Sequence, residues 1–166
     1  YCVWGPDGSK LQKFDLDQLC RDIDIIYNNP NVRAVIFTDA CLFYTRKRAK
    51  VVCDRIAAAD RRIPTVFTLD VHVLDEDMCQ HLSKVNLYQN QWHFGLQTTT
   101  PDALAILERP GGGGPQKYLE KIALLKKHLP DAEVSFDLIY GLPGDDYEGF
   151  RNSIDLTLKL SPAKIH

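Results

Sequence analysis

Two hydrophobic patterns alternate along the chain. Short apolar runs, typical of buried parallel strands, are separated by longer stretches in which apolar residues recur every three or four positions, as in amphipathic helices. The runs that predict strands are 32–37, 65–69, 92–97, 134–140 and 163–166. The stretches that predict helices are 15–28, 45–60, 75–85, 100–109, 115–129 and 145–158.

Helix-capping residue types stand at the start of these stretches, which supports the helix assignment. They are Asp15, Thr45, Asp75, Thr100, and Asp145 or Asp146. Strands and helices follow one another at intervals of about 30 to 40 residues, the usual length of a βαβ unit. The sequence therefore predicts an α/β fold, a parallel sheet with helices outside it. Periodicity leaves open whether the sheet is flat or curved into a barrel.

Composition and charge narrow the range of partners. The 166 residues fit one domain, with 45% hydrophobic residues, 25% charged residues and a net charge of −2. This balance gives no reason to expect nucleic acid or an anionic membrane as a general partner. No apolar run approaches the roughly 20 residues that span a bilayer. We therefore expect neither nucleic acid nor a membrane as a partner.

Cysteine usage favours a reducing setting, the cytoplasm. There are five cysteines, an odd number that cannot all pair with one another. They form no CxxC pair and are scattered at positions 2, 20, 41, 53 and 79. Such a pattern does not resemble a disulfide framework. Cys20, Cys41, Cys53 and Cys79 are interpreted as structural thiols, with Cys20 buried on its helix.

Polar residues follow several of the predicted strands. In a parallel sheet the carboxyl ends of the strands meet at one edge, which is where sites form. The residues at these ends are Asp39, Asp70 with His72, Gln97 with Thr98, and the turn 141–145.

Three segments, taken in order, carry a resemblance to a known family. They are Tyr1-Cys2, 94–99 (FGLQTT) and 137–145 (DLIYGLPGD). Together they resemble the radical S-adenosylmethionine (SAM) enzymes, in which a CxxxCxΦC loop binds a [4Fe–4S] cluster. The resemblance makes Cys2 the third cysteine and a metal ligand, and Tyr1 the aromatic neighbour of the SAM adenine. The other two cysteines are expected just upstream. Three thiolates then hold three irons and leave the fourth for SAM.

The same resemblance assigns residues to SAM. Gln97 matches the position that reaches the ribose hydroxyls, with Thr98 as a second candidate. Asp39 stands where the family often has Gly-Gly-Glu, and a carboxylate there could accept a hydrogen bond from the SAM ammonium. The loose GxIxGxxE pattern that packs on adenine assigns this role to Ile139, Gly141, Leu142 and Pro143. Asp137 replaces its first glycine and Gly144 its glutamate.

Within the family the chain looks most like the cobalamin-binding class. That likeness implies a methyltransferase that uses the [4Fe–4S] cluster, SAM and cobalamin, the last held by a domain outside residues 1–166. The methylated centre would be an unreactive carbon or phosphorus, such as tryptophan C2. Two alternatives stay open. One is a radical SAM oxidoreductase or methylthiotransferase without cobalamin, and the other a non-catalytic α/β-barrel domain that has lost the cluster.

The resemblance also implies an architecture and partners. Residues 1–166 would form the catalytic core, a partial TIM-like (β/α)6 barrel lacking its first strand. The substrate would be a small molecule or peptide-derived, and the electron donor a flavodoxin or ferredoxin. The 166 residues alone are expected to be inactive, because the cluster loop would be incomplete.

Overall fold

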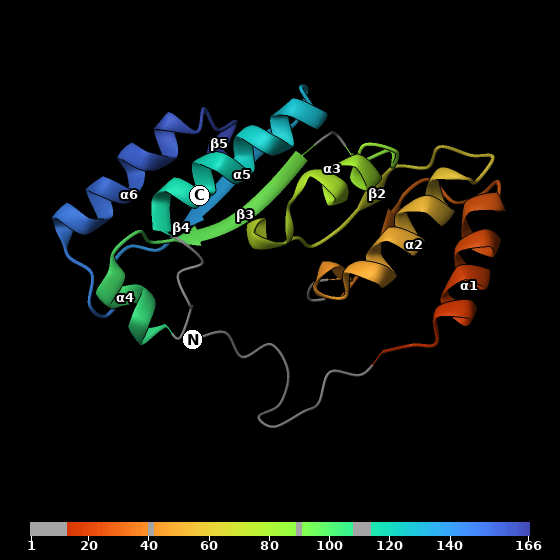
Figure 1. The fold of residues 1–166 in the computed structure, drawn as a ribbon, viewed down its shortest axis with the longest axis horizontal. Coiled ribbons are helices and arrows are strands. Elements are labelled where there is room, and N and C mark those ends of the chain that lie inside the picture. Colours follow the sequence, from red (N-terminus) through yellow and green to blue (C-terminus); the bar gives the residue numbers. More distant parts are fainter. Residues whose placement is uncertain (1–12, 40–41, 89–90, 108–113) are drawn as a thin grey trace. The chain divides into compact units, whose positions relative to one another are not determined.

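Helices and strands alternate along the chain in the computed structural model, which describes residues 13–39, 42–88, 91–107 and 114–166 (Figure 1). The helices are α1 (Leu16–Asn28), α2 (Arg46–Ala57), α3 (Glu76–Leu82), α4 (Pro101–Ile106), α5 (Gly114–His128) and α6 (Tyr147–Lys159). The strands are β1 (Val35–Ile36), β2 (Thr65–Val66), β3 (Gln91–Gln97), β4 (Glu133–Leu138) and β5 (Lys164–Ile165). Short 3-10 turns lie at η1 (Leu42–Tyr44) and η2 (Val71–Val73).

The chain divides into two compact units, each with a parallel sheet. The described residues up to Thr68, together with 80–88, belong to the first unit. Residues 69–79 and those from 91 onward belong to the second. The predicted α/β class with parallel strands and outer helices is confirmed. Within the ranges that the structure describes, the strands do not join into a closed barrel.

In the first unit α1 packs against α2, and β1 pairs with β2. Asp15 caps α1 by accepting from the N–H of Gln18 at 2.9 Å. The fully buried Tyr27 of α1 reaches β2, where its hydroxyl lies 2.6 Å from the Oγ1 of Thr65. This bond satisfies two polar groups that would otherwise be costly to bury.

The second unit is built on the sheet β3–β4–β5, whose strands lie in sequence order. Parallel crossovers are right-handed, so the successive connections through α5 and α6 place both helices on the same face (Figure 1). Phe94 of β3 and Phe136 of β4 are buried with ring centroids 6.2 Å apart. Ile122 and Leu125 of α5 are buried as well, which is expected of the helix face turned towards the sheet.

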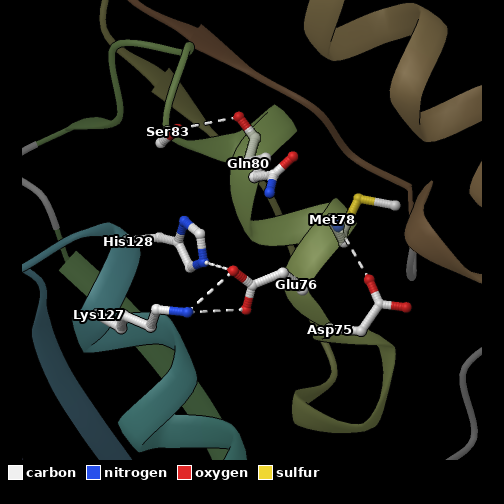
Figure 2. Close-up of polar contacts among 7 residues, drawn as sticks. All are labelled: Asp75, Glu76, Met78, Gln80, Ser83, Lys127 and His128. Carbon is white, nitrogen blue, oxygen red and sulfur yellow. Dashed lines mark hydrogen bonds and ion pairs between the residues drawn. The ribbon is translucent and has the colours of Figure 1, made fainter.

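The segment before and within α3 is joined to α5 by polar contacts in the second unit. Asp75 caps α3 by accepting from the N–H of Met78 at 2.9 Å. Figure 2 shows the carboxylate of Glu76 facing two side chains of α5. Its Oε1 lies 3.0 Å from Lys127 Nζ and 2.9 Å from His128 Nε2. The His128 contact is close enough for an ion pair, but its angle is not that of a hydrogen bond.

The predicted elements differ from the observed ones mainly in length. The runs 32–37 and 65–69 form strands of only two residues each, because β1 and β2 pair over Val35–Ile36 and Thr65–Val66. The helix predicted over 75–85 ends at Leu82. Among the residues that the structure describes, no helix has both the length and the apolar character that crossing a bilayer requires.

Candidate functional site

The carboxyl ends of β3 and β4 meet at one edge of the second unit's sheet. The two strands pair in parallel from Gln91 opposite Glu133 onward. The register shifts between Gly95 and Gln97, so that Gln97 pairs with Leu138. An irregularity of this kind re-aims a side chain at the end of a strand. It brings two of the segments assigned to SAM, 97–98 and 139–143, to the same edge.

Gln97 is held in an unusual backbone conformation. Its φ is 67°, and the N–H of Thr98 donates to the carbonyl of Leu96 at 2.9 Å, which closes a γ-turn around it. A γ-turn with positive φ at its centre is rare and strained. A non-glycine residue in this region costs about 1–3 kcal/mol and persists only where its surroundings hold it.

The strained turn is tied directly to the turn after β4. The carbonyl of Gln97 accepts a hydrogen bond from the N–H of Ile139 at 2.9 Å. The residue assigned to ribose and the first residue assigned to adenine are therefore joined through their backbones. Their relative position does not depend on any mobile side chain.

A carboxylate bridges the same two turns. Asp145 accepts a hydrogen bond from Thr98 Oγ1 at 2.8 Å through one oxygen and from Thr100 Oγ1 at 2.6 Å through the other. Thr98 is buried, with 1% of its surface exposed. Hydrogen bonds to a charged acceptor are stronger than neutral ones. Asp145 therefore fixes the β3–α4 connection against the β4–α6 connection.

Helix α6 supplies a second tie to the β3–α4 connection. The fully buried Ser153 of α6 accepts from the N–H of Thr99 at 2.8 Å and donates to the carbonyl of Gly149 at 3.0 Å. Each of residues 98–100 therefore forms a hydrogen bond with α6 or with the turn before it: Thr98 and Thr100 with Asp145, and Thr99 with Ser153. A segment held in this way is rigid, which suits a binding site.

Two glycines give the turn after β4 its shape. Gly141 has φ 82° and nothing within 4 Å of the position that a Cβ would take, so a flat ligand could approach its backbone. Gly144 has φ 78°, and a Cβ there would lie 3.1 Å from the backbone of Asp102 and Ala103. The first glycine leaves space beside the turn, and the second lets the turn pack onto α4.

The other residues assigned to adenine have different surroundings. Leu142 is 9% exposed and belongs to a hydrophobic cluster with Ala103 and Leu107, against which Ile139 also packs. Pro143 is exposed. A contact between Leu142 and a ligand would therefore involve its backbone, because its side chain is occupied by packing.

The face of the sheet opposite α5 and α6 is polar. Strand pairing places His93 beside Ser135 and Ser135 beside Lys164, with Gly95 beside Asp137 in the next row. The rings of His93 and His166 have centroids 5.8 Å apart. Strands of a parallel sheet that is packed on both faces are apolar on both. This face is therefore suited to water or a polar ligand rather than to a packed core.

Three further residues were assigned to the cofactors, namely Asp39, Tyr1 and Cys2. Asp39 is exposed after β1 and belongs to the first unit. Tyr1 and Cys2 lie outside the described residues, so their roles stay predictions. Within the described ranges no group of three or more His, Cys, Asp or Glu side chains is placed to hold a metal ion.

His72 and Asp70 form a local pair. Asp70 Oδ1 lies 2.7 Å from Nδ1 of His72 and accepts from the same residue's N–H at 2.9 Å. The ring of His72 meets that of Tyr118 edge-on at 5.6 Å. Asp70 therefore caps η2, and the ring of His72 packs against Tyr118.

The thiols divide by exposure. Burial raises the pKa of Cys53 to about 12 and that of Cys79 to about 11, so both stay protonated at neutral pH. Their interpretation as structural thiols agrees with full burial. Cys20 is only half-buried, so its predicted burial was wrong: it lies on the same face of α1 as Ile23 and Tyr27, but nearer the start of the helix, where burial is incomplete. Cys41 lies outside the described residues.

Sequence reasoning missed the role of Asp145. The sequence assigned Asp145 or Asp146 to the start of the last helix, and only Asp146 caps α6, by accepting from the N–H of Gly149 at 2.8 Å. Asp145 instead receives two threonine hydroxyls from the other turn. The available signal was the run Thr98-Thr99-Thr100 after a strand, which supplies hydroxyl donors for a carboxylate.

The groups at this edge fit SAM in kind. Gln97 carries both amide donors and an acceptor, which are what ribose hydroxyls bind. The open space beside Gly141 and the apolar residue Ile139 suit a flat purine.

Comparisons with known proteins place the chain in a family. A family model described as the Radical SAM superfamily matches residues 1–157. The chain is also similar to curated proteins named tRNA-2-methylthio-N(6)-dimethylallyladenosine synthase. It is 32% identical to the one from Sulfurihydrogenibium sp. (strain YO3AOP1) over 81 residues, which cover 49% of this chain and 18% of the relative.

Two further relatives with the same name extend this likeness. The chain is 30% identical to the one from Aquifex aeolicus (strain VF5) over 87 residues, 52% of this chain and 19% of the relative. A match to the one from Bifidobacterium adolescentis is 24% identical over 144 residues, 84% of this chain and 28% of the relative. The chain thus spans less than a third of the length of each relative. Because the family model matches nearly the whole chain, the protein belongs to the radical SAM superfamily.

Proposed function

We propose that the edge formed by Gln97, Thr98 and residues 139–143 binds SAM in a radical SAM reaction. The observation that carries the proposal is the hydrogen bond from the N–H of Ile139 to the carbonyl of Gln97. It joins the proposed ribose and adenine contacts into one rigid element. The family match supports the same cofactors, a [4Fe–4S] cluster and SAM.

Each residue has a defined task in this proposal. The amide of Gln97 binds the ribose hydroxyls, while Ile139 and the open backbone of Gly141 contact the adenine. Asp39 would accept from the SAM ammonium, Tyr1 would lie beside the adenine, and Cys2 would be an iron ligand. When bound, the cluster supplies the electron and SAM the reactive group, whereas the protein binds and orients them.

SAM binding by the full-length protein tests this assignment. Calorimetry after anaerobic reconstitution should show that Gln97→Ala weakens SAM binding by about tenfold, as expected for a lost polar contact. Gln91→Ala is the matched control, because Gln91 lies at the other end of β3 and is also half-buried. Equal affinities of the two variants would contradict the proposal. Cys2→Ala should lower the bound iron.

The reaction class has two candidates. The names of the relatives favour methylthio transfer. The resemblance of segments 94–99 and 137–145 favours a cobalamin-dependent methyltransferase acting on an unreactive carbon or phosphorus. Cobalamin that co-purifies with the full-length protein would favour the cobalamin-dependent methyltransferase. Turnover by protein that contains no cobalamin would favour methylthio transfer. A protein that stays colourless after reconstitution and does not bind SAM would instead indicate a domain that has lost its cluster.

Substrate and donor follow from the reaction class. We propose a small-molecule or peptide-derived substrate, an electron donor such as flavodoxin or ferredoxin, and a cytoplasmic location. Since the relatives are named for a modified tRNA nucleoside, RNA is the competing substrate class. Comparing the affinity of the full-length protein for unmodified tRNA with its affinity for the members of a peptide library separates these two substrate classes. Tight binding to tRNA alone would overturn the small-substrate proposal.

A further inference from the structure

The strained turn at Gln97 requires a restraint, and Asp145 is placed to provide it. The γ-turn that closes around Gln97 ends at Thr98, whose hydroxyl donates to Asp145 at 2.8 Å. We propose that Asp145 is a positioning residue for SAM, which holds Gln97 in the conformation that reaches the ribose. This inference rests on the proposed function, because it assigns a residue to the same site.

The carboxylate sets the direction of the hydrogen bonds around it. The hydroxyls of Thr98 and Thr100 both donate to the carboxylate of Asp145, one to each of its oxygens. The Oγ1 of Thr98 then accepts from the N–H of Thr100 at 3.0 Å. The hydroxyl hydrogen of Thr98 is therefore already used, and the side chain is 1% exposed. Thr98 acts through the position of Gln97 rather than by direct contact with ribose.

The surrounding chain leaves room for this carboxylate. A Cβ at Gly149 would lie 2.2 Å from Asp145 Oδ1 and 2.3 Å from Thr100 Oγ1, so only glycine fits there without a shift. Thr100 stands at the N-cap of α4 but forms no side-chain cap. Its hydroxyl donates to Asp145 instead. The local structure thus favours the bridge over the cap.

Asp145 and Asp146 have separate tasks, which makes the proposal testable. Asp146 caps α6 through its side chain, whereas Asp145 accepts the backbone N–H of Asp146 at 3.0 Å and the two threonine hydroxyls. Replacing the side chain of Asp146 removes a helix cap and leaves the bridge in place. Replacing Asp145 removes the bridge and leaves the cap.

The experiment compares Asp145→Asn with Asp146→Ala in the full-length protein. The probe is S-adenosylhomocysteine, measured by calorimetry on protein without a reconstituted cluster, so that no activity is needed. We expect Asp145→Asn to weaken binding by about tenfold, and Asp146→Ala to lower the unfolding midpoint without a change in affinity. Equal affinities of wild type and Asp145→Asn would overturn the inference, and so would an equal loss in Asp146→Ala.

The threonine variants supply a conservative rescue. Thr98→Ser keeps the hydroxyl and should keep wild-type affinity, whereas the nearly isosteric Thr98→Val should weaken binding as Asp145→Asn does. Hydrogen exchange of the Thr98 and Ile139 amides should accelerate in Asp145→Asn and Thr98→Val, and stay unchanged in Asp146→Ala. Unchanged exchange in all variants would contradict a positioning role.

Gln97→Ala separates this inference from the proposed function. If wild type does not bind the probe, or Gln97→Ala binds it as tightly, the proposed SAM site is wrong. If Gln97→Ala weakens binding and Asp145→Asn does not, the site stands and the positioning role is wrong. In the Gln97→Ala background, Asp145→Asn should cause little further loss, because both act on one contact.

Discussion

The carbonyl of Gln97, the last residue of β3, accepts a hydrogen bond of 2.9 Å from the N–H of Ile139, the first residue after β4. This bond lies where both strands end, directly after the register shift between Gly95 and Gln97. One partner has a positive φ, and the other begins a turn that contains two glycines with positive φ. Several backbone restraints therefore hold this edge of the sheet. Small changes to its backbone should alter the stability of the protein and its affinity for SAM.

The glycines of this turn should respond differently to the same substitution. Gly144→Ala combines an unfavourable φ with a Cβ only 2.8 Å from Ile106 Cδ1 and 3.1 Å from the α4 backbone. We expect a loss of about 2–4 kcal/mol in the free energy of unfolding. Gly141→Ala adds only the backbone strain, because its Cβ would have no neighbour within 4 Å, and should cost about 1 kcal/mol.

Urea unfolding of the two glycine variants in the full-length protein checks this ranking. SAM binding is the second measurement, because the Cβ of Gly141→Ala would occupy the space proposed for adenine. We therefore expect Gly141→Ala, the variant that loses less stability, to bind SAM more weakly than wild type. A larger loss of stability in Gly141→Ala than in Gly144→Ala would contradict the account of the turn.

Local patterns were enough to predict most of the secondary structure. Asp15, Asp75 and Asp146 cap helices where the sequence placed them, because a cap depends on residues within three positions. The alternation of strands and helices likewise predicted the parallel pairing. The lengths of β1 and β2 were not predicted, since a strand ends where its partner ends, which is information from another part of the chain.

The sequence identified the segments that form the candidate site, but it did not reveal the hydrogen bonds between them. Family resemblance pointed to Gln97 and Ile139, which are indeed hydrogen-bonded to each other. The bridge from Thr98 to Asp145 joins residues 47 positions apart, and no periodicity reveals such a pairing. The γ-turn at Gln97 was also hidden, because a positive φ is rarely predicted at a glutamine.

Tyr27 should make the stability of the first unit depend on alkaline pH. Burial raises the pKa of its phenol to about 12, with the hydrogen bond to Thr65 opposing the shift. The native state therefore keeps the proton while the unfolded chain releases it near the ordinary value of 10.0. Stability from this group is full below about pH 10 and is lost as the pH rises towards about 12.

Tyr27→Phe isolates this effect from that of the buried thiols. At neutral pH the variant loses the hydrogen bond to Thr65 and should be less stable by about 1 kcal/mol. In urea unfolding from pH 9 to 11, its stability should fall less steeply than that of wild type. Parallel pH profiles would show that Tyr27 is not the titrating group.

Thiol labelling should follow the burial of the cysteines. Cys53 and Cys79 are fully buried with raised pKa values, whereas Cys20 is half-buried, and thiolates are the reactive form. We expect iodoacetamide at neutral pH to modify Cys20 in the native full-length protein and to leave Cys53 and Cys79 unmodified. Peptide mass spectrometry checks the sites, and a urea-unfolded sample, in which all of them react, is the control. Rapid native labelling of Cys53 would contradict its packing.

Glu76 should link the α3 segment to α5 in a pH-dependent way. Its pKa is lowered by the hydrogen bond from Lys127 and, to a smaller degree, by His128 (Figure 2). A lowered carboxyl pKa contributes stability above the ordinary value of 4.5, and this contribution is lost as the pH falls through the lower native value. Glu76→Gln should therefore be less stable than wild type near pH 7, and the two should converge in acid.

Urea unfolding of wild type and Glu76→Gln at pH 7 and at pH 3 measures this convergence. Glu120→Gln, which changes an exposed glutamate on α5, controls for the general loss of a surface charge. The difference at pH 7 should be small and should shrink in high salt, because Glu76 is exposed and its partners are screened by ions. A difference that grows on acidification would mean that Glu76 stabilises the fold in its neutral form, contrary to the ion pair with Lys127.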